Sequence, residues 1–234
     1  MKIAVFGTGI VGKTIAARLT DLGHSVTIGT RDVAKTLASA AKDAYGTPPF
    51  SDWYKQFKDK IKLASYAEAA ATAEILFNCT LGQSSVDVLK QAGNENLKGK
   101  VLIDVSNPLD FSKGMPPSLS PVNTDSLGEL IQRNFADLKV VKTLNTMNCY
   151  LMVNPAIIPG DHNVFVSGND PGAKTTAKEI LKSFGWIESN IIDLGDITTA
   201  RGTEQLLPIW LRLWNVLQNP MFNFRIVIGA APKM

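Results

Sequence analysis

Residues 1–31 read MKIAVFGTGIVGKTIAARLTDLGHSVTIGTR, and this stretch decides the fold that we expect. Its apolar run IAVF is typical of a buried parallel strand. The following GTGIVG matches the pattern G-x-G-x-x-G at the point where a strand gives way to a helix. In this pattern Gly7 permits a tight turn, Gly9 lets the backbone approach a pyrophosphate, and Gly12 lets the helix lie close to the strand.

The helix after the turn is amphipathic. Val11, Ile15, Leu19 and Leu22 fall on one face, and Gly23 stands where a left-handed residue ends a helix. Unpaired N–H groups at the start of such a helix bind anions. The turn and the helix start therefore predict a site for a dinucleotide pyrophosphate.

The end of the second expected strand indicates which dinucleotide binds. A free ribose 2′-hydroxyl calls for Asp or Glu there, whereas a 2′-phosphate needs donors and positive charge. The chain offers Thr30 and Arg31, with Lys35 one helical turn further on, and these side chains predict NADP(H) rather than NAD(H). Asp32 is expected to cap the next helix. The alternative that Arg31 and Lys35 are ordinary surface charges stays open.

The bulk composition fits a single enzyme or binding domain with a small addition. The chain has 234 residues, a formal net charge of +3 and two cysteines, Cys79 and Cys149. The small, dispersed charge forms no basic stripe, so nucleic acid is not an expected partner. The cysteines show no metal-ligand spacing or disulfide framework, which favours a reducing cytoplasm and no metal site. Neither a signal peptide nor a membrane span is predicted.

Four further strands are expected, at 61–64, 74–79, 101–105 and 139–144, interspersed with helices. With the first two they complete a doubly wound parallel sheet of the Rossmann type. We therefore predict an α/β fold with an NADP-binding domain at residues 1–145.

The carboxyl ends of these strands should meet at one edge of the sheet, where such a fold binds the rest of its dinucleotide. Asn78 and Cys79 end the fourth expected strand and Gln83 follows it, and Asn107 follows the fifth. Asn107 either offers its amide to the nicotinamide or its ribose, or only shapes the Asn-Pro turn, and both interpretations stay open. Cys79 is expected to be a small wall residue, because no base lies near it in sequence.

Two segments interrupt the alternation. Residues 43–60 carry a cluster of aromatic side chains around Trp53. This cluster is either a lid over the cofactor or a short amphipathic turn packed on the sheet, and its spacing favours packing. Residues 111–123 are rich in proline and are expected to form a loop.

Residues 146–234 predict a small C-terminal α/β domain that closes the cleft over the nucleotide. Strands are expected at 164–167 and 191–194, on either side of a helix that ends at Gly185. Alternation over 222–228 predicts a last strand.

A second helix of this C-terminal part carries Trp210 and Trp214 on a broad apolar face. Pro208 either kinks this helix or marks its first turn. Such a tryptophan stripe is typical of a core or a subunit interface, and the apolar tail favours a homodimer.

Two histidines are candidate acid-base groups. His24 stands at the turn into the second strand and is expected to be structural. His162 follows Pro-Gly-Asp and is expected to be a solvated loop residue. The sequence thus indicates no compelling base.

Several short motifs carry a family resemblance. They are GTGIVG at 7–12, GTR at 29–31, SNP at 106–108, KTLNTM at 142–147, VFVSG at 164–168, DLG at 193–195 and ARGTE at 200–204. Together they resemble the coenzyme F420-dependent NADP oxidoreductase family, whose relatives include the cytosolic domains of membrane ferric reductases. The resemblance covers nearly the whole chain.

In that family the reduced nicotinamide faces a deazaflavin or flavin ring across a cleft between two domains. The resemblance implies pyrophosphate contacts from Thr8, Gly9, Ile10 and Val11, and 2′-phosphate contacts from Thr30, Arg31 and Lys35. It implies that Cys79, Gln83 and Cys149 border the nicotinamide, and that Asn145, Met147 and Asn148 border the acceptor ring. Archaeal members carry histidine where this chain has Asn145.

We therefore predict a cytoplasmic NADP(H)-dependent oxidoreductase that passes a hydride to a ring acceptor, F420 or a flavin such as FMN or FAD. Direct transfer between two rings needs positioning and exclusion of water rather than a protein base. The alternatives are a reductase of a small carbonyl or imine substrate, which would need a proton donor, and a non-catalytic NADP(H)-sensing protein.

Overall fold

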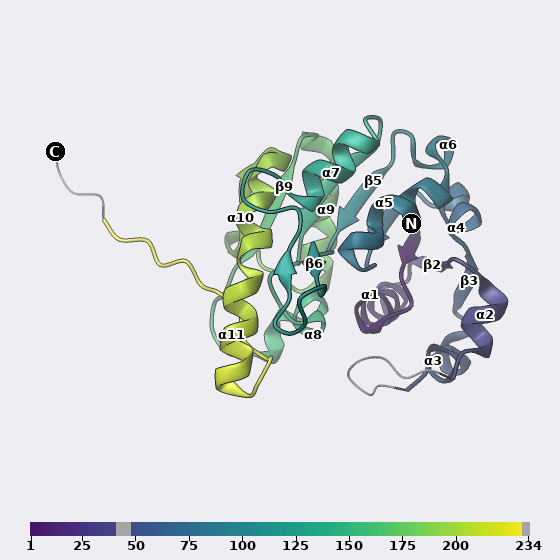
Figure 1. The fold of residues 1–234 in the computed structure, drawn as a ribbon, viewed down its shortest axis with the longest axis horizontal. Helices are drawn as coiled ribbons and strands as arrows, with labels where there is room; N and C mark the ends of the chain where they lie inside the picture. Colours follow the sequence, from purple (N-terminus) through teal and green to yellow (C-terminus); the bar gives the residue numbers. More distant parts are fainter. Residues whose placement is uncertain (41–47, 231–234) are drawn as a thin grey trace.

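One sheet of eight strands runs through the computed structural model, which describes residues 1–40 and 48–230 (Figure 1). The strand order is β10-β9-β8-β5-β4-β1-β2-β3. The chain winds outward from the central β1, first to β2 and β3 and then to β4, β5 and β8, which is the doubly wound order that the sequence predicts. The strands are β1 (Lys2–Phe6), β2 (Ser25–Thr30), β3 (Ile61–Ser65), β4 (Ile75–Asn78), β5 (Val101–Asp104), β8 (Lys139–Thr143), β9 (Val164–Gly168) and β10 (Ile191–Gly195).

Helices cover both faces of the sheet, and two apolar clusters fill the space between the layers. On the first face lie α1 (Ile10–Asp21), α3 (Phe50–Phe57), α8 (Cys149–Val153) and α9 (Pro171–Phe184). On the second face lie α4 (Tyr66–Thr72), α5 (Gly82–Ala92), α6 (Asn94–Leu97), α7 (Leu127–Asn134) and α10 (Ala200–Gln205). Within the described residues, no helix is both long and apolar enough to cross a membrane.

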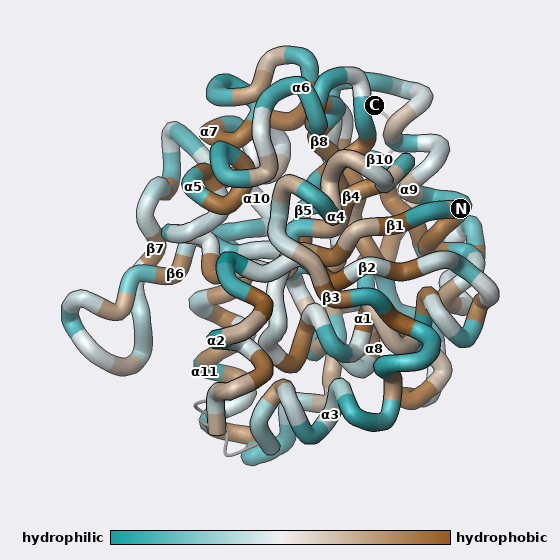
Figure 2. Tube along the Cα trace, turned by 90° about the vertical axis from the view of Figure 1, so that its right-hand side faces the viewer, coloured by the Kyte–Doolittle hydropathy of each residue, from teal (hydrophilic) through white to brown (hydrophobic). Residues whose placement is uncertain are grey.

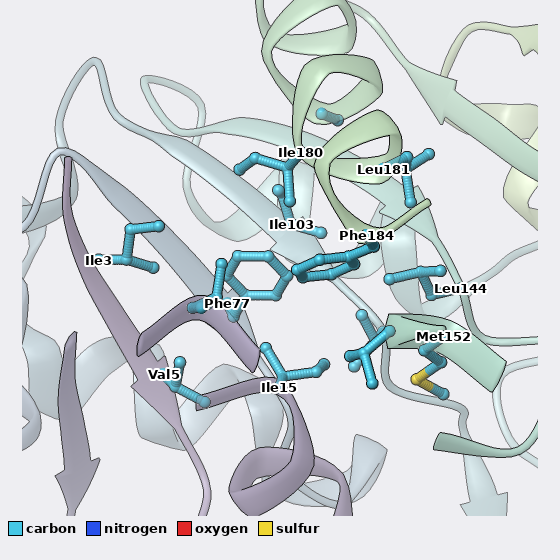
Figure 3. Packing of buried hydrophobic residues seen from close by; sticks show 14 of the residues in the cluster. Ile3, Val5, Ile15, Phe77, Ile103, Leu144, Met152, Ile180, Leu181 and Phe184 are labelled. Atoms are coloured by element: carbon cyan, nitrogen blue, oxygen red, sulfur yellow. The ribbon is translucent and has the colours of Figure 1, made fainter. Parts of the chain in front are cut away.

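Alternation along the strands divides the two clusters. Ile3 and Val5 of β1 point to the first cluster, whereas Ala4 and Phe6 point to the second. Figure 3 shows the first cluster, in which Phe184 at the end of α9 packs beside Phe77. Hydrophobic segments gather around the central strands β1 and β4, and many of the connecting loops are hydrophilic (Figure 2). Both layers are therefore built on the same sheet.

The sheet continues past residue 145, where we expected the first domain to end. β9 runs antiparallel to β8, with Thr143 opposite Val166, and β10 is parallel to β9. The amino end of β9 consequently lies beside the carboxyl end of β8. The division of the chain into two domains at this point stays a prediction.

Several local predictions are confirmed. Asp32 caps α2 (Val33–Ala38), because its carboxylate accepts the N–H of Lys35 at 2.9 Å. Gly23 and Gly185 adopt the positive φ values that end α1 and α9. The segment 111–123 is mostly loop, as expected, but it contains β7 (Ser118–Leu119), which pairs antiparallel with β6 (Leu109–Asp110). The sequence did not indicate this short hairpin.

The last strand expected at 222–228 is wrong. This segment is extended, but it pairs with no strand and is held mainly by Asn163. The N–H of Asn163 donates to the carbonyl of Phe224 at 2.9 Å, and its side-chain oxygen accepts the N–H of Ile226 at 2.7 Å. An alternating sequence forms a β-strand only where a neighbouring strand is available for backbone hydrogen bonds.

The helix expected around the tryptophan stripe is α11 (Leu207–Leu217), and the separate helix α10 directly precedes it. Pro208 lies in the first turn of α11, which confirms that interpretation over a kink.

The described part of the aromatic segment forms α3. Phe50 is buried, and Trp53 and Phe57 stack with their ring centroids 4.5 Å apart against the first apolar cluster. Residues 43–47 lie outside the described residues. For residues 48–60, the packing that we favoured is confirmed.

Candidate active site

The predicted site residues gather at the carboxyl edge of the parallel strands. Because β1, β2, β4, β5 and β8 run in one direction, the segments that follow them meet there. In Figure 1, α11 stands on one side of α1, and α2 and α3 stand on the other. The gathered segments are 7–12, 30–31, 78–83, 107 and 145–149.

The glycine turn is built by close backbone contacts. Gly7 has φ +123°, and a Cβ atom there would lie 2.6 Å from the carbonyl oxygen of Cys79. A Cβ on Gly12 would lie 2.1 Å from the carbonyl oxygen of Gly7, so the helix can approach the strand only without a side chain.

The start of α1 is open to an anion. A Cβ on Gly9 would meet nothing within 4 Å, and Gly9 caps α1 without any side-chain hydrogen bond. The first turn of α1 contains no acidic residue. Free N–H groups and the positive end of the helix dipole therefore face open space, as a pyrophosphate site requires.

Hydroxyl and cationic groups lie at the end of β2. The Thr30 hydroxyl is 2.7 Å from that of Thr36, a residue that the sequence analysis did not single out. Arg31 is exposed, and no described carboxylate forms an ion pair with it. The Lys35 ammonium lies 3.8 Å from the Asp32 carboxylate, and it is too exposed for this pair to be strong. These groups suit a 2′-phosphate.

Two thiols stand close to α1. A Cβ on Gly12 would lie 3.7 Å from that of Cys79, and the hydroxyl of Thr14 donates to Sγ of Cys149 at 3.8 Å. Desolvation raises the pKa of Cys79 well above 9.0, helped by the negative charge of Asp104. Burial also raises the pKa of Cys149. Both groups stay protonated thiols at neutral pH, which supports a wall role rather than nucleophilic chemistry.

Asn107 and Asn145 are bonded to each other. The Asn107 amide donates to the Asn145 carbonyl oxygen at 2.7 Å, and the Asn145 amide donates to Oδ1 of Asn107 at 3.0 Å. Leu144, just before Asn145, has φ +64°, an unusual conformation for a bulky residue that its burial in the core maintains. The pair joins the ends of β5 and β8, and each amide retains further hydrogen-bonding capacity.

The remaining predicted residues differ in accessibility. Met147 is buried, and Asn148 caps α8 by accepting the N–H of Tyr150 at 3.0 Å. Gln83, in the first turn of α5, reaches Asp110 at 3.5 Å. Asn78 is fully buried, with its amide donating to both Ser85 and Asp104 at 2.9 Å.

Behind this edge lies a buried ionic cluster that the sequence analysis missed. The ammonium of Lys142 donates to Asp104 at 2.6 Å, to the carbonyl oxygen of Ser106 at 2.8 Å and to Glu204 at 2.8 Å. The Lys142 and Asp104 side chains are fully buried, and that of Glu204 is 2% exposed. All three N–H donors of the ammonium are thus used. The sequence did offer one sign of this cluster, because Lys142 stands inside the apolar strand KVVKT, where a buried ammonium needs partners.

The cluster extends to both sides. Oδ1 of Asp104 accepts from Asn78 and from the N–H of Ser106, and Oδ1 of Asn78 in turn accepts the Thr80 hydroxyl at 2.7 Å. On the other side, Glu204 accepts the N–H groups of Leu127 and Gly128 at 2.8 and 3.1 Å, which start α7. One network therefore runs from α10 to the loop after β4.

A second contact holds α10 on α7. Arg201 donates to both oxygens of Glu129, at 2.5 and 2.9 Å. These bonds from Arg201 hold the pKa of Glu129 below its usual value of 4.5, against the opposing effect of burial.

Neither histidine reaches the carboxyl edge. His24 lies near the N-terminal amine, and partial burial lowers its pKa, so its expected structural role fits. His162 is buried rather than solvated, because Pro155 and Asn223 occupy its two ring nitrogens at 3.0 and 2.9 Å and Trp186 packs edge-on against it. In the described part of the chain, no group of three or more His, Cys, Asp or Glu side chains is placed to hold a metal ion.

The fold and the site define the class of protein: this is an NADP-dependent oxidoreductase with a Rossmann-like nucleotide-binding sheet. Residues 2–108 match the family model described as NADP oxidoreductase coenzyme F420-dependent. A solved structure from Arthrobacter sp. FB24, provisionally assigned as an F420-dependent NADP reductase, is 58% identical and superimposes with a TM-score of 0.91, over 97% of this chain and 100% of that one. The chain belongs to the F420-dependent NADP oxidoreductase family.

Two curated relatives extend the comparison. The F420-dependent NADP reductase of Methanothermobacter marburgensis is 29% identical over the full length of both chains. The metalloreductase STEAP3 of Rattus norvegicus is 25% identical over 89% of this chain. The chain spans 38% of the length of that metalloreductase, so the similarity concerns one part of it.

Replacing Glu129 by Gln should lower the free energy of unfolding by about 1 kcal/mol near neutral pH, because charge-assisted bonds to Arg201 are lost. The folded-state pKa of Glu129 lies below 4.5, so its contribution is present above that pH and disappears as the pH falls through the lowered value. Urea unfolding at a series of pH values should therefore show the difference from wild type shrinking in acid. The exposed Asp87→Asn variant is the control, and a difference that did not depend on pH would contradict the prediction.

Proposed function

We propose that this oxidoreductase transfers a hydride between NADPH and a ring acceptor, either the deazaflavin F420 or a flavin such as FMN or FAD. The observation that carries the proposal is the state of the ionisable groups buried at the carboxyl edge. Lys142, Asp104 and Glu204 satisfy one another, and both thiols have raised pKa values. Ring-to-ring hydride transfer suits such an edge, because it asks the protein for positioning and exclusion of water.

The chain's own groups would divide the binding of the nucleotide between them. The turn at 7–12 and the start of α1 would hold the pyrophosphate, and Thr30, Arg31 and Lys35 would hold the 2′-phosphate. Cys79, Gln83, Asn107 and Cys149 would border the nicotinamide, whereas the buried Asn78 would act by fixing Thr80. Bound NADPH supplies the hydride.

The acceptor ring would lie beside Asn145, Met147 and Asn148, at the junction between residues 1–145 and residues 146–234. We treat these two parts as a nucleotide-binding domain and a smaller domain that closes over it. The names of the Methanothermobacter and Arthrobacter relatives favour F420 as the ring. The two unpaired thiols favour a reducing, cytoplasmic setting.

The acceptor assay tests the proposal directly. Purified protein is mixed with NADPH, and nicotinamide absorbance is followed after adding F420, FMN, FAD, or a small ketone or imine. Rapid oxidation that depends on F420 or a flavin is expected. Turnover with only the ketone or imine would replace the proposal with a small-substrate reductase, and tight NADPH binding without turnover would indicate a sensor.

Replacing Arg31 by Ala should weaken NADPH binding by about 1.5 to 3 kcal/mol, because a charge-assisted hydrogen bond to the 2′-phosphate is lost. NADH lacks that phosphate and should lose far less. Titration calorimetry with both nucleotides measures the difference, and Lys98→Ala, exposed next to α6, serves as the control. Equal losses for the two nucleotides would mean that Arg31 does not bind the phosphate.

We also propose a homodimer formed through α11 and the tail that follows it. Val216 on α11 is 76% exposed, and Val227 and Ile228 in the tail are 83% and 88% exposed. Phe222, near the start of the tail, stacks on Trp210 of α11 with the ring centroids 5.4 Å apart. The end of the tail leaves the body of the molecule in Figure 1, so the outer face of α11 around Val216 stays exposed. A two-fold dimer would let each tail cover the partner's α11 and remove both apolar surfaces from water.

Analytical ultracentrifugation tests this association. The wild-type chain should sediment as a dimer, and Val216→Asp should sediment as a monomer, because a charge would be placed in the interface. Asn215→Asp, at the neighbouring exposed position, is the control for added charge. A wild-type chain that stays monomeric at high concentration would overturn the dimer and leave the hydride-transfer proposal untouched.

A further inference from the structure

Lys142 on β8 connects two parts of the chain that are far apart in sequence, residues 104–106 and α10. Its ammonium binds the end of β5 through Asp104, the loop after β5 through the carbonyl oxygen of Ser106, and α10 through Glu204. Ser106 directly precedes Asn107, the residue next to the expected nicotinamide site. A single buried cation thus joins the C-terminal part of the chain to the loop that borders the nucleotide.

The buried charges of this cluster hold the connection from α10 through Lys142 to Ser106 in one geometry. Two buried carboxylates face one ammonium, and Glu204 obtains further compensation from the N–H groups that start α7. In such a low-dielectric site each partner depends on the others, because an unpaired buried charge is costly. Ser106 is also held by its hydroxyl, which donates to the carbonyl oxygens of Asn78 and Thr80 at 3.3 and 3.0 Å. Glu204 acts on the same residue from the other side, by fixing the ammonium that binds the Ser106 carbonyl oxygen.

Backbone contacts pass this position on to the nucleotide edge. The Asn107 side chain is bonded to Asn145, so the loop after β5 and the loop after β8 move together. A Cβ on Gly82 would lie 2.2 Å from the Asn107 carbonyl oxygen, so the start of α5 touches the same loop. A small displacement at Ser106 would therefore reach the loops after β5 and β8 and the start of α5.

We propose that Glu204 and Lys142 are positioning residues: through the buried ammonium, α10 holds the Asn107 loop in the place required by the nicotinamide end of the bound nucleotide. This rests on the proposed NADPH site. Neither side chain touches the nucleotide, and both act through the backbone of Ser106.

The Glu204→Gln variant tests the proposal with the least disturbance. It keeps the size of the side chain but removes the charge that faces Lys142. Lys142→Met would leave two carboxylates buried without a cation and is expected to prevent folding. Glu129→Gln is the matched control, because it breaks the other contact between α7 and α10 without touching Lys142.

The measurement compares NADPH with adenosine 2′,5′-bisphosphate, which carries the 2′-phosphate but no nicotinamide. Glu204→Gln should weaken NADPH roughly tenfold, the effect of one impaired hydrogen-bonded contact, and leave the bisphosphate unchanged. Glu129→Gln should change neither affinity at a temperature where it is fully folded. Equal weakening of both ligands by Glu204→Gln, or an equal effect of the two variants, would reduce Glu204 to a structural role and overturn the proposal.

A second readout does not depend on nucleotide. Hydrogen exchange of the Ser106 amide, which is bonded to Asp104 at 3.1 Å, should be faster in Glu204→Gln than in Glu129→Gln. Unchanged exchange would refute the connection itself. If the wild type bound no NADPH while exchange still rose, the proposed function would fail and the connection would stand.

Discussion

The ammonium of Lys142 is the constraint on which the carboxyl edge depends. It is buried completely, and it can stay charged there only because Asp104, Ser106 and Glu204 accept all of its N–H groups. This requirement fixes the ends of β5, β8 and α10 relative to one another. The apolar clusters on the two faces hold the layers together without direction, whereas the cluster around Lys142 sets the position of individual loops.

The topology explains how so distant a partner as Glu204 reaches this place. β9 returns antiparallel to β8, and the chain then passes through α9 and β10 before α10 packs against the start of α7. The C-terminal part thereby contributes both to the sheet and to the support of the nucleotide edge. Its helix α10 is short, and Glu204 and Arg201 attach it with charged contacts rather than with a large apolar face.

Much of the fold could be predicted because it depends on local patterns. Apolar runs located the strands, and Asp32 and Gly185 marked helix ends by chemistry within a few residues. The candidate edge residues were also placed correctly at one edge, since parallel strands share a direction. The partners of Lys142 could not be predicted, because Asp104 and Glu204 lie 38 and 62 residues away and pair with it only in the folded chain. The predictions of a solvated His162 and of a strand at 222–228 were wrong for the same reason, because the surroundings of both are formed by distant parts of the chain.

The contact between Gly82 and the carbonyl oxygen of Asn107 has a consequence for how such an enzyme can diversify. Where two backbones touch, no new side chain can be introduced without separating them, so this part of the edge is closed to adaptation by point substitution. Acquiring another partner molecule would have to draw on residues with free space around them, such as Leu81, Met115 and the outer face of α11. The fold thus combines one backbone contact that tolerates no added side chain with exposed positions where substitutions can change what the protein binds.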